Sequence, residues 1–230
     1  MRAERFARIV STLQRRQPDL TIAMESLHKT RNLGAIARTC DAVGIGTIHG
    51  ISSDPTNVTL AHKVAGGTEK WVSLQHHLTI REAYDEFRRM GFSILAAGLG
   101  DDAVDFRSVD YTQPTVIVVG SELDGLSIEA SMQAGKRIRV PLLGMVESLN
   151  VSVATGVILY EAARQRDVAG QYRSQRISDD DYHRLLFEWL YPSVSQYCRK
   201  NRRKYPNLDE HGEIIEAVTG NRRDGLKLIS

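Results

Sequence analysis

The segment PTVIVVG, residues 114–120, constrains the fold more than any other part of the sequence. It is a short, continuous run of β-branched apolar residues between a proline and a glycine. Such runs are typical of strands that are buried on both faces of a parallel sheet. Parallel neighbours need a crossover between them, usually a helix. The chain is therefore expected to alternate short strands with helices.

This alternation is expected from residue 20 to beyond residue 150. Further strands are expected over 20–26, 47–52, 71–75, 92–99 and 137–140. Helices are expected over 32–43, over 80–90 and from 151 onward, with Asn32, Thr79 and Asn150 as their N-caps. The order of these elements predicts an α/β fold with a mostly parallel sheet.

Helical segments flank the expected sheet. Apolar residues at helical spacing predict an amphipathic helix over 3–16, and the pattern from residue 180 onward is wholly helical with a break at Pro192. We therefore expect a basic N-terminal helix (1–19), a sheet domain (20–170) and a basic, helical C-terminal extension (171–230).

Basic residues gather near both ends of the chain. The net charge of +2 is too small to indicate a nucleic-acid partner by itself. Two basic clusters around a nearly neutral centre favour a polyanion, although solvated helix faces are the alternative. The predicted RNA-binding residues are Arg8, Arg15, Arg16, Arg199, Lys200, Arg202 and Arg203. Tyr197 and Tyr205 flank the second cluster, where they could stack on RNA bases.

Several other classes of protein do not fit the sequence. No apolar run approaches the ~18 residues of a membrane span, and residues 1–20 do not form a secretory signal, so we expect a cytoplasmic protein. Cys40 and Cys198 lack metal-ligand spacing, and the adjacent His76 and His77 would point to opposite faces of a strand, so no metal is expected. Phosphate-binding glycine motifs and a GxSxG elbow are missing from the sequence.

Ligands of α/β sheets bind beyond the carboxyl ends of the strands, and three loops at such positions carry unusual sequences. The segments are NLGAIARTCDAVG (32–44), VIVVGSELDGLS (116–127) and RVPLLGMVESLNVSVATGVILYE (139–161). In order and spacing they resemble the three motifs of the SpoU/TrmH branch of the SPOUT RNA 2′-O-ribose methyltransferases. The resemblance extends to RRQPDL, to DDAVDFRSVDYTQP and to the basic tail, and so covers most of the chain.

The resemblance implies an enzyme that uses S-adenosyl-L-methionine (AdoMet), works as a homodimer and has a deep trefoil knot in the C-terminal half of its sheet. Without it, an unknotted chain would be expected. The implied reaction is 2′-O-methylation of a tRNA ribose, with guanosine 18 of the D-loop as the expected target. The same chemistry on another tRNA ribose or on rRNA is the alternative, and a knotted RNA-binding protein without enzymatic activity is a third reading.

The resemblance also implies the site residues. Ala97, Gly120, Val140 and Leu149 would bind the cofactor. Arg38 would be the catalytic arginine, and Asn32, Glu122, Ser148 and Asn150 would complete the site. Because a guanidinium is almost always protonated, Arg38 is a poor base. It would either take the proton of the 2′-hydroxyl with help from its surroundings or orient the hydroxyl while water takes the proton.

Glycines and carboxylates near these loops allow further expectations. Gly120 and Gly144 are expected to permit close approach of the backbone to the cofactor. Asp101, Asp102 and Asp105 lie together in the sequence, and we expect a solvated turn there in preference to a metal site.

Overall fold

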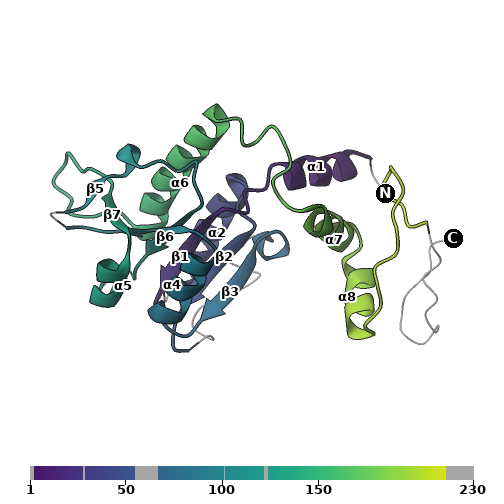
Figure 1. Ribbon diagram of the computed structural model, residues 1–230, viewed down its shortest axis with the longest axis horizontal. Helices are drawn as coiled ribbons and strands as arrows, with labels where there is room; N and C mark the ends of the chain where they lie inside the picture. Colours follow the sequence, from purple (N-terminus) through teal and green to yellow (C-terminus); the bar gives the residue numbers. More distant parts are fainter. Residues whose placement is uncertain (1–2, 28, 55–66, 101, 122–123, 216–230) are drawn as a thin grey trace. The chain divides into compact units, whose positions relative to one another are not determined.

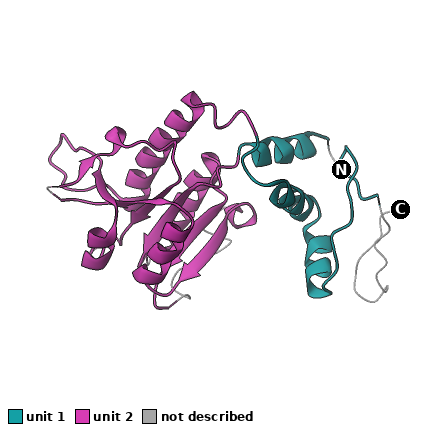
Figure 2. Ribbon diagram, viewed as in Figure 1, with its two compact units in different colours: residues 1–15, 175–230 teal, residues 16–174 magenta. Residues whose placement is uncertain are grey.

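The computed structural model describes residues 3–27, 29–54, 67–100, 102–121 and 124–215. The chain divides into two compact units (Figure 2). The sheet unit comprises residues 16–174, and the helical unit joins residues 1–15 to residues 175–230. The N-terminal helix thus belongs to the same unit as the C-terminal helices, although about 160 residues separate them in the sequence.

A seven-stranded sheet forms the centre of the sheet unit (Figure 1). Its strands are β1 Leu20–Glu25, β2 Thr47–Ile51, β3 Ser73–His77, β4 Ser93–Ala97, β5 Val104–Asp105, β6 Thr115–Val119 and β7 Lys136–Arg139. They are arranged in the order β3-β2-β1-β6-β4-β7-β5, and every ladder between them is parallel. The predicted α/β fold with a mostly parallel sheet is therefore confirmed. The two-residue edge strand β5 was not predicted.

Helices cover both faces of the sheet (Figure 1). The helices of this unit are α2 Thr30–Ala42, η2 Thr68–Lys70, α4 Ile80–Arg89, η3 Phe106–Ser108, α5 Ile128–Gln133 and α6 Val151–Val168. Alternate residues of β6 point to opposite faces: Ile117 packs with α2 and α6, whereas Val118 packs with α4 and α5. Burial on both faces explains why β6 is apolar at every position.

Two of the three predicted helix caps are confirmed. The Asn150 side chain accepts a hydrogen bond from the backbone N–H of Ser152 (2.9 Å), and the Thr79 side chain accepts one from that of Glu82 (3.2 Å). The prediction for Asn32 is wrong. Helix α2 begins at Thr30, and the N–H of Asn32 already bonds to the carbonyl of Lys29 within the first turn, so Asn32 lies inside the helix.

The C-terminal end of α6 is fixed by a buried arginine. Arg166 is fully buried, and its guanidinium donates hydrogen bonds to the Asp19 carboxylate (2.6 Å) and the Tyr111 carbonyl (2.8 Å). It also donates to the Gln17 side chain and to the carbonyls of Asp19 and Gln113. These bonds join α6 to the segments that precede β1 and β6.

The helical unit contains α1 Ala3–Gln14, α7 Asp179–Leu190 and α8 Pro192–Lys200. Pro192 is at the start of α8, where its missing N–H costs no helical hydrogen bond, so the predicted break is confirmed. The chain then returns to α7: the Tyr191 hydroxyl donates to the Gly212 carbonyl at 2.9 Å. Among the described residues, no helix has both the length and the apolar character that a bilayer span requires.

Candidate active site

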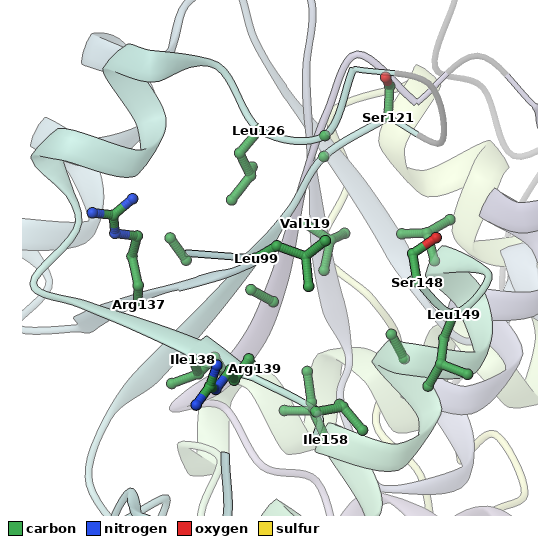
Figure 3. Close-up of a pocket in the computed structure, with 18 of the residues that line it drawn as sticks. Leu99, Val119, Ser121, Leu126, Arg137, Ile138, Arg139, Ser148, Leu149 and Ile158 are labelled. Atoms are coloured by element: carbon green, nitrogen blue, oxygen red, sulfur yellow. The ribbon is translucent and has the colours of Figure 1, made fainter. Parts of the chain in front are cut away.

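A cavity of about 590 Å³ opens at the carboxyl ends of β4, β6 and β7 (Figure 3). Parallel sheets of this kind bind ligands at that edge, and the volume is within the ~300–1,000 Å³ of small-molecule sites. Apolar side chains line much of it, including Leu99, Val119, Leu126, Leu149 and Ile158. Polar lining residues include Lys29, Ser121, Asp124, Arg137, Arg139, Ser148 and Asn150.

The four residues that the sequence assigned to cofactor binding line this one cavity. Ala97 ends β4, Gly120 follows β6, Val140 follows β7, and Leu149 belongs to the loop before α6. More than 50 residues of sequence separate the first from the last. Parallel strands bring them together because their carboxyl ends meet at the same edge of the sheet.

Gly120 is required by the turn that follows it. A Cβ on Gly120 would collide with the backbone of Gly125 and Leu126. Ser121 and Gly125 exchange backbone hydrogen bonds of 3.0 and 3.1 Å, which hold the turn against Gly120. A Cβ on Gly144, by contrast, would meet no atom of the described residues within 4 Å, so none of their contacts explains a glycine there.

The structure brings together some of the predicted catalytic residues. Ser148 and Asn150 line the cavity, and the Asn150 amide donates to the Asn32 side-chain oxygen at 3.4 Å. Arg38 is exposed on α2 and does not line the cavity. Glu122 lies outside the described residues. The site in this chain is therefore an open cavity with an asparagine pair at its edge.

Cationic side chains that the sequence did not single out also line the cavity. Arg137 and Arg139 extend from β7, and Lys29 is the N-cap residue of α2. Arg137 is paired with Asp102, whose carboxylate accepts from its Nε at 2.8 Å. Lys29 and Arg139 lie at a helix start and a strand end, which is the signal that could have identified them, whereas Arg137 lies within β7.

The predicted aspartate turn is exposed to solvent where it is described, and its carboxylates also form ion pairs: the Asp102 side chain is 59% exposed and that of Asp105 37%. Asp102 pairs with Arg137, and Asp105 pairs with Arg107 at 2.6 Å. Hydrogen bonds from Arg107 lower the pKa of Asp105 to about 2. Asp101 lies outside the described residues. Within the part of the chain that the structure describes, no group of three or more His, Cys, Asp or Glu side chains could hold a metal ion.

Two buried histidines form a pair away from the cavity. His49 Nδ1 and His77 Nε2 are 2.9 Å apart on the adjacent strands β2 and β3, and Phe87 packs edge-on against both rings. Burial, with a contribution from His77, lowers the pKa of His49 to about 3. Burial also lowers the pKa of His77. His77 thus has a partner within the protein, and His76, on the opposite face, is exposed.

Burial decides which of the predicted RNA-binding residues can contact a phosphate. The prediction for Arg16 is wrong: only 2% of it is exposed, and it pairs with Asp41 (2.9 Å) and donates to the carbonyls of Ile45 and Trp71. The others are exposed: Arg8, Arg15, Arg199, Lys200, Arg202 and Arg203. Sequence alone did not separate Arg15 from Arg16.

Two of these exposed basic residues contact aromatic side chains of the helical unit. Arg199 donates to Glu188 at 2.9 Å and to the Tyr205 hydroxyl at 3.2 Å. The Tyr205 ring stacks on Phe187, with centroids 4.7 Å apart, so one of its faces is already covered. The Arg203 guanidinium lies 5.8 Å from the centre of the Tyr197 ring.

Comparison with known families identifies the class of protein. Residues 19–160 match the model of the SpoU rRNA Methylase family, and residues 164–217 match that of the SpoU rRNA methylase C-terminal region. The chain belongs to the SpoU methylase family. It is 44% identical over 216 residues to a tRNA (guanosine(18)-2′-O)-methyltransferase of Escherichia coli K12, an alignment that spans 93% of this chain and 94% of that protein.

Solved structures of similar proteins extend the comparison. The crystal structure of the A. aeolicus TrmH/SpoU tRNA modifying enzyme is 40% identical and matches with a TM-score of 0.77 over 83% of this chain and 97% of that one. The AdoMet-bound rRNA methyltransferase of Sinorhizobium meliloti is 29% identical, with a TM-score of 0.56 over 67% of this chain and 59% of that one. This SpoU methylase family member thus shares its fold with a tRNA-modifying enzyme over almost that enzyme's whole length.

Proposed function

We propose that this protein is a tRNA (guanosine(18)-2′-O)-methyltransferase that takes its methyl group from AdoMet. One observation carries the proposal. Ala97, Gly120, Val140 and Leu149, which the family resemblance assigned to the cofactor, line a single cavity that Asn150 also lines. The relative from E. coli, which carries this activity by name, aligns over 93% of the chain.

The cavity has the chemistry that AdoMet needs. Bound there, AdoMet would supply an electrophilic methyl group. Leu99, Val119 and Leu126 offer apolar surface for the adenine ring, while Ser121 and Asp124 offer polar groups beside it. The tight turn after Gly120 brings backbone N–H and C=O groups to the wall of the cavity. Such groups can read the edge of a base without long side chains.

Methyl transfer also requires that the ribose hydroxyl be oriented and lose its proton. Ser148, Asn150 and Asn32 lie at the edge of the cavity, where they would position the ribose. Arg38, exposed on α2, would meet the RNA from the solvent side. Because a guanidinium binds hydroxyl and phosphate oxygens well and is a poor base, we assign Arg38 the task of orienting the 2′-hydroxyl while water takes the hydroxyl proton. Glu122, which the family resemblance assigns to the site, is proposed to complete it.

The basic residues of the helical unit would bind tRNA phosphates. Arg8, Arg15, Lys200 and Arg202 are exposed there. Lys200→Glu should weaken tRNA binding and reduce the dependence of log Kd on log salt by roughly 0.9 per lost phosphate contact. Arg89→Glu is a matched control, since Arg89 is an exposed cation on α4 of the sheet unit. An unchanged salt dependence of tRNA binding in Lys200→Glu would show that Lys200 does not contact a tRNA phosphate.

A homodimer is supported by exposed apolar side chains. Val153, Val157 and Tyr160 follow one face of α6 and are 51%, 39% and 61% exposed, and Leu143 and Met145 of the preceding loop are fully exposed. Contiguous apolar surface of this kind is typical of protein interfaces. Val157→Glu should therefore shift the protein toward a monomer in sedimentation velocity, whereas Val168→Glu at the far end of α6 should not.

The trefoil knot and the cytoplasmic location are also part of the proposal. The knot is supported by the strand order, in which β7 lies between β4 and β5, and by the similarity to the A. aeolicus enzyme. Cytoplasmic location is supported by the substrate, since bacterial tRNA is made and used there.

Transfer of labelled methyl from AdoMet to an unmodified tRNA transcript tests the proposal. The labelled position is mapped as the ribose that resists alkaline cleavage. We expect label at guanosine 18, and we expect Arg38→Ala to abolish it while Arg31→Ala, an exposed neighbour on α2, retains it. Label on another tRNA ribose or on rRNA would keep the chemistry and reject the target; the S. meliloti relative, an rRNA methyltransferase, makes rRNA the second substrate to try. Label on no RNA would reject the proposal.

A further inference from the structure

Glu25 is a buried carboxylate that has no part in the proposed chemistry. It is the last residue of β1 and is only 9% exposed. Its Oε2 accepts a hydrogen bond of 2.8 Å from the backbone N–H of Ser127, which lies 102 residues later in the sequence. A carboxylate is costly to bury unless it accepts hydrogen bonds, and a bond to an ionised acceptor is stronger than one between neutral groups. This bond therefore fixes the position of Ser127 relative to the sheet.

Ser127 joins the cavity wall to helix α5. Gly120, Ser121, Gly125 and Leu126 line the cavity immediately before it, and Leu126 and Ser121 are labelled in Figure 3. The Ser127 hydroxyl accepts from the N–H of Ala130 at 3.0 Å and so caps α5. Glu25 thus bonds to the chain at the point where the turn of residues 120–127 ends and α5 begins.

Helix α5 packs on the core through Ala130, which is fully buried. It has six residues, and Ile128 and Met132 on its outer side are 80% and 79% exposed. The Tyr84 hydroxyl donates to the Ala130 carbonyl (3.0 Å), and Arg88 donates to the Gln133 carbonyl (2.9 Å). Both of these bonds hold α5 itself. Among the side-chain hydrogen bonds recorded for this region, the one from Ser127 to Glu25 ties the cavity turn to the central sheet.

We propose that Glu25 is a positioning residue for cofactor binding, whose carboxylate holds the described residues of this turn (120, 121 and 124–127) in the arrangement that binds AdoMet. The inference rests on the proposed function, since it takes AdoMet as the ligand. Without the acceptor, the Ser127 N–H loses its partner and the turn adopts other conformations. A ligand that binds only the ordered turn then loses apparent affinity in proportion to the ordered fraction.

Calorimetric titration of the full-length protein with AdoMet tests this role. Glu25→Gln keeps an acceptor oxygen and should bind AdoMet within about twofold of the wild type, whereas Glu25→Met removes the acceptor and should raise the Kd about tenfold. Thr21→Val is the matched control, because Thr21 is buried in the same strand and its hydroxyl donates to the Thr47 carbonyl at 2.7 Å. It should lower stability without changing the Kd.

Steady-state kinetics separate positioning from general destabilisation. In Glu25→Met the KM for AdoMet should rise about tenfold, while the KM for tRNA and the kcat at saturating AdoMet stay within about twofold, because bound AdoMet restores the turn. A variant that was merely less folded would lose kcat at an unchanged KM. Should Glu25→Met not fold, Glu25→Asp keeps the charge, withdraws the acceptor, and should raise the Kd about threefold.

Three results would overturn the inference while leaving the proposed function intact. The first is an AdoMet affinity equal to the wild type's in Glu25→Met or, if that variant does not fold, in Glu25→Asp. The second is a loss of AdoMet affinity in Glu25→Gln as large as that in Glu25→Met. The third is an equal loss of AdoMet affinity in Thr21→Val. If the wild-type protein bound no AdoMet, the inference and the proposed function would both be overturned. The titration of the wild type, made before that of any variant, distinguishes this case.

Discussion

The two ends of helix α6 have opposite characters. At the C-terminal end, Arg166 is fully buried and donates to a carboxylate, to a side-chain amide oxygen and to three carbonyls. At the N-terminal end, Asn150 is exposed, its contact with Asn32 is long at 3.4 Å, and the preceding loop leaves Leu143 and Met145 fully exposed. The polar groups are buried at one end, whereas at the other Asn150 lines the cavity. We infer that the buried end contributes stability and the open end contributes function.

The largest effect is expected at the buried end. Arg166→Met should lower the free energy of unfolding of the sheet unit by about 3–5 kcal/mol, because it breaks a buried ion pair from one side only, that of Arg166 with Asp19. Urea denaturation measures this. Arg164→Met is the control on the same helix: Arg164 is 62% exposed in its pair with Glu161, so less than about 1 kcal/mol should be lost. Equal losses in the two variants would contradict the comparison.

The cavity turn should give the next largest effect. Gly120→Ala should cost about 3 kcal/mol and abolish AdoMet binding, because the new methyl group would collide with the Gly125 backbone. Gly144→Ala introduces the same methyl group into open space, so stability should change by less than about 0.5 kcal/mol. Thermal unfolding with and without AdoMet distinguishes the two. A stable, AdoMet-binding Gly120→Ala variant would show that the turn is not rigid.

Acidification should lower the free energy of unfolding through His49, which belongs to neither end of α6. The pKa of His49 is lower in the folded protein, about 3, than the ~6.5 of an unfolded histidine, so between these values the unfolded chain binds more protons. The contribution of His49 is therefore fully present above pH ~6.5 and is lost as the pH falls toward 3. About 2 kcal/mol should be lost by pH 5, as measured by urea denaturation at several pH values.

Variants show whether this pH dependence belongs to the histidine pair. His49→Leu combined with His77→Leu should flatten the dependence between pH 7 and pH 5. His183→Gln removes an exposed histidine of the helical unit and should leave the dependence as it is in the wild type. An unchanged slope in the double variant would assign the acid sensitivity to other groups.

The smallest effect on stability, together with a large effect on activity, is expected at the open end. Asn150→Ala should cost only about 1 kcal/mol through loss of the cap, while methyl transfer at saturating substrate should fall at least about tenfold. Thr79→Ala removes the cap of α4 and should cost the same stability at full activity. Asn150→Ser, which keeps a capping oxygen, should recover the stability and not the activity. Recovery of both stability and activity in Asn150→Ser would show that Asn150 acts only as a helix cap.

This contrast also explains what the sequence could and could not predict. Strand and helix order follow from local patterns such as PTVIVVG, and the carboxyl ends of parallel strands lie together. The family resemblance then assigned Ala97 and Val140 to the cofactor, and both line the cavity. Burial of a charged side chain depends on distant partners. Arg15 and Arg16 are neighbours in a basic cluster, yet only Arg16 meets Asp41 and two carbonyls.

Long-range side-chain contacts escaped prediction for the same reason. Glu25 and Ser127 are 102 residues apart, and nothing in AMES or GLS indicates that they are bonded. The pairing of His49 with His77 depends on the register of β2 against β3, which the sequence pattern does not determine. The cap at Asn32 was misplaced because the first turn of α2 forms through backbone bonds to Lys29, without a capping side chain.

Hydrogen–deuterium exchange of the intact protein, with and without saturating AdoMet, tests the central claim most directly. We predict that AdoMet slows exchange in residues 96–99, 119–126 and 140–152 and leaves residues 109–115 and 162–168 unchanged, since Arg166 already holds the latter. A second cavity lies at the amino ends of β4, β6 and β7. Protection confined to other segments, such as residues 92–95 and 133–136 around that cavity, would contradict the assignment of the AdoMet site.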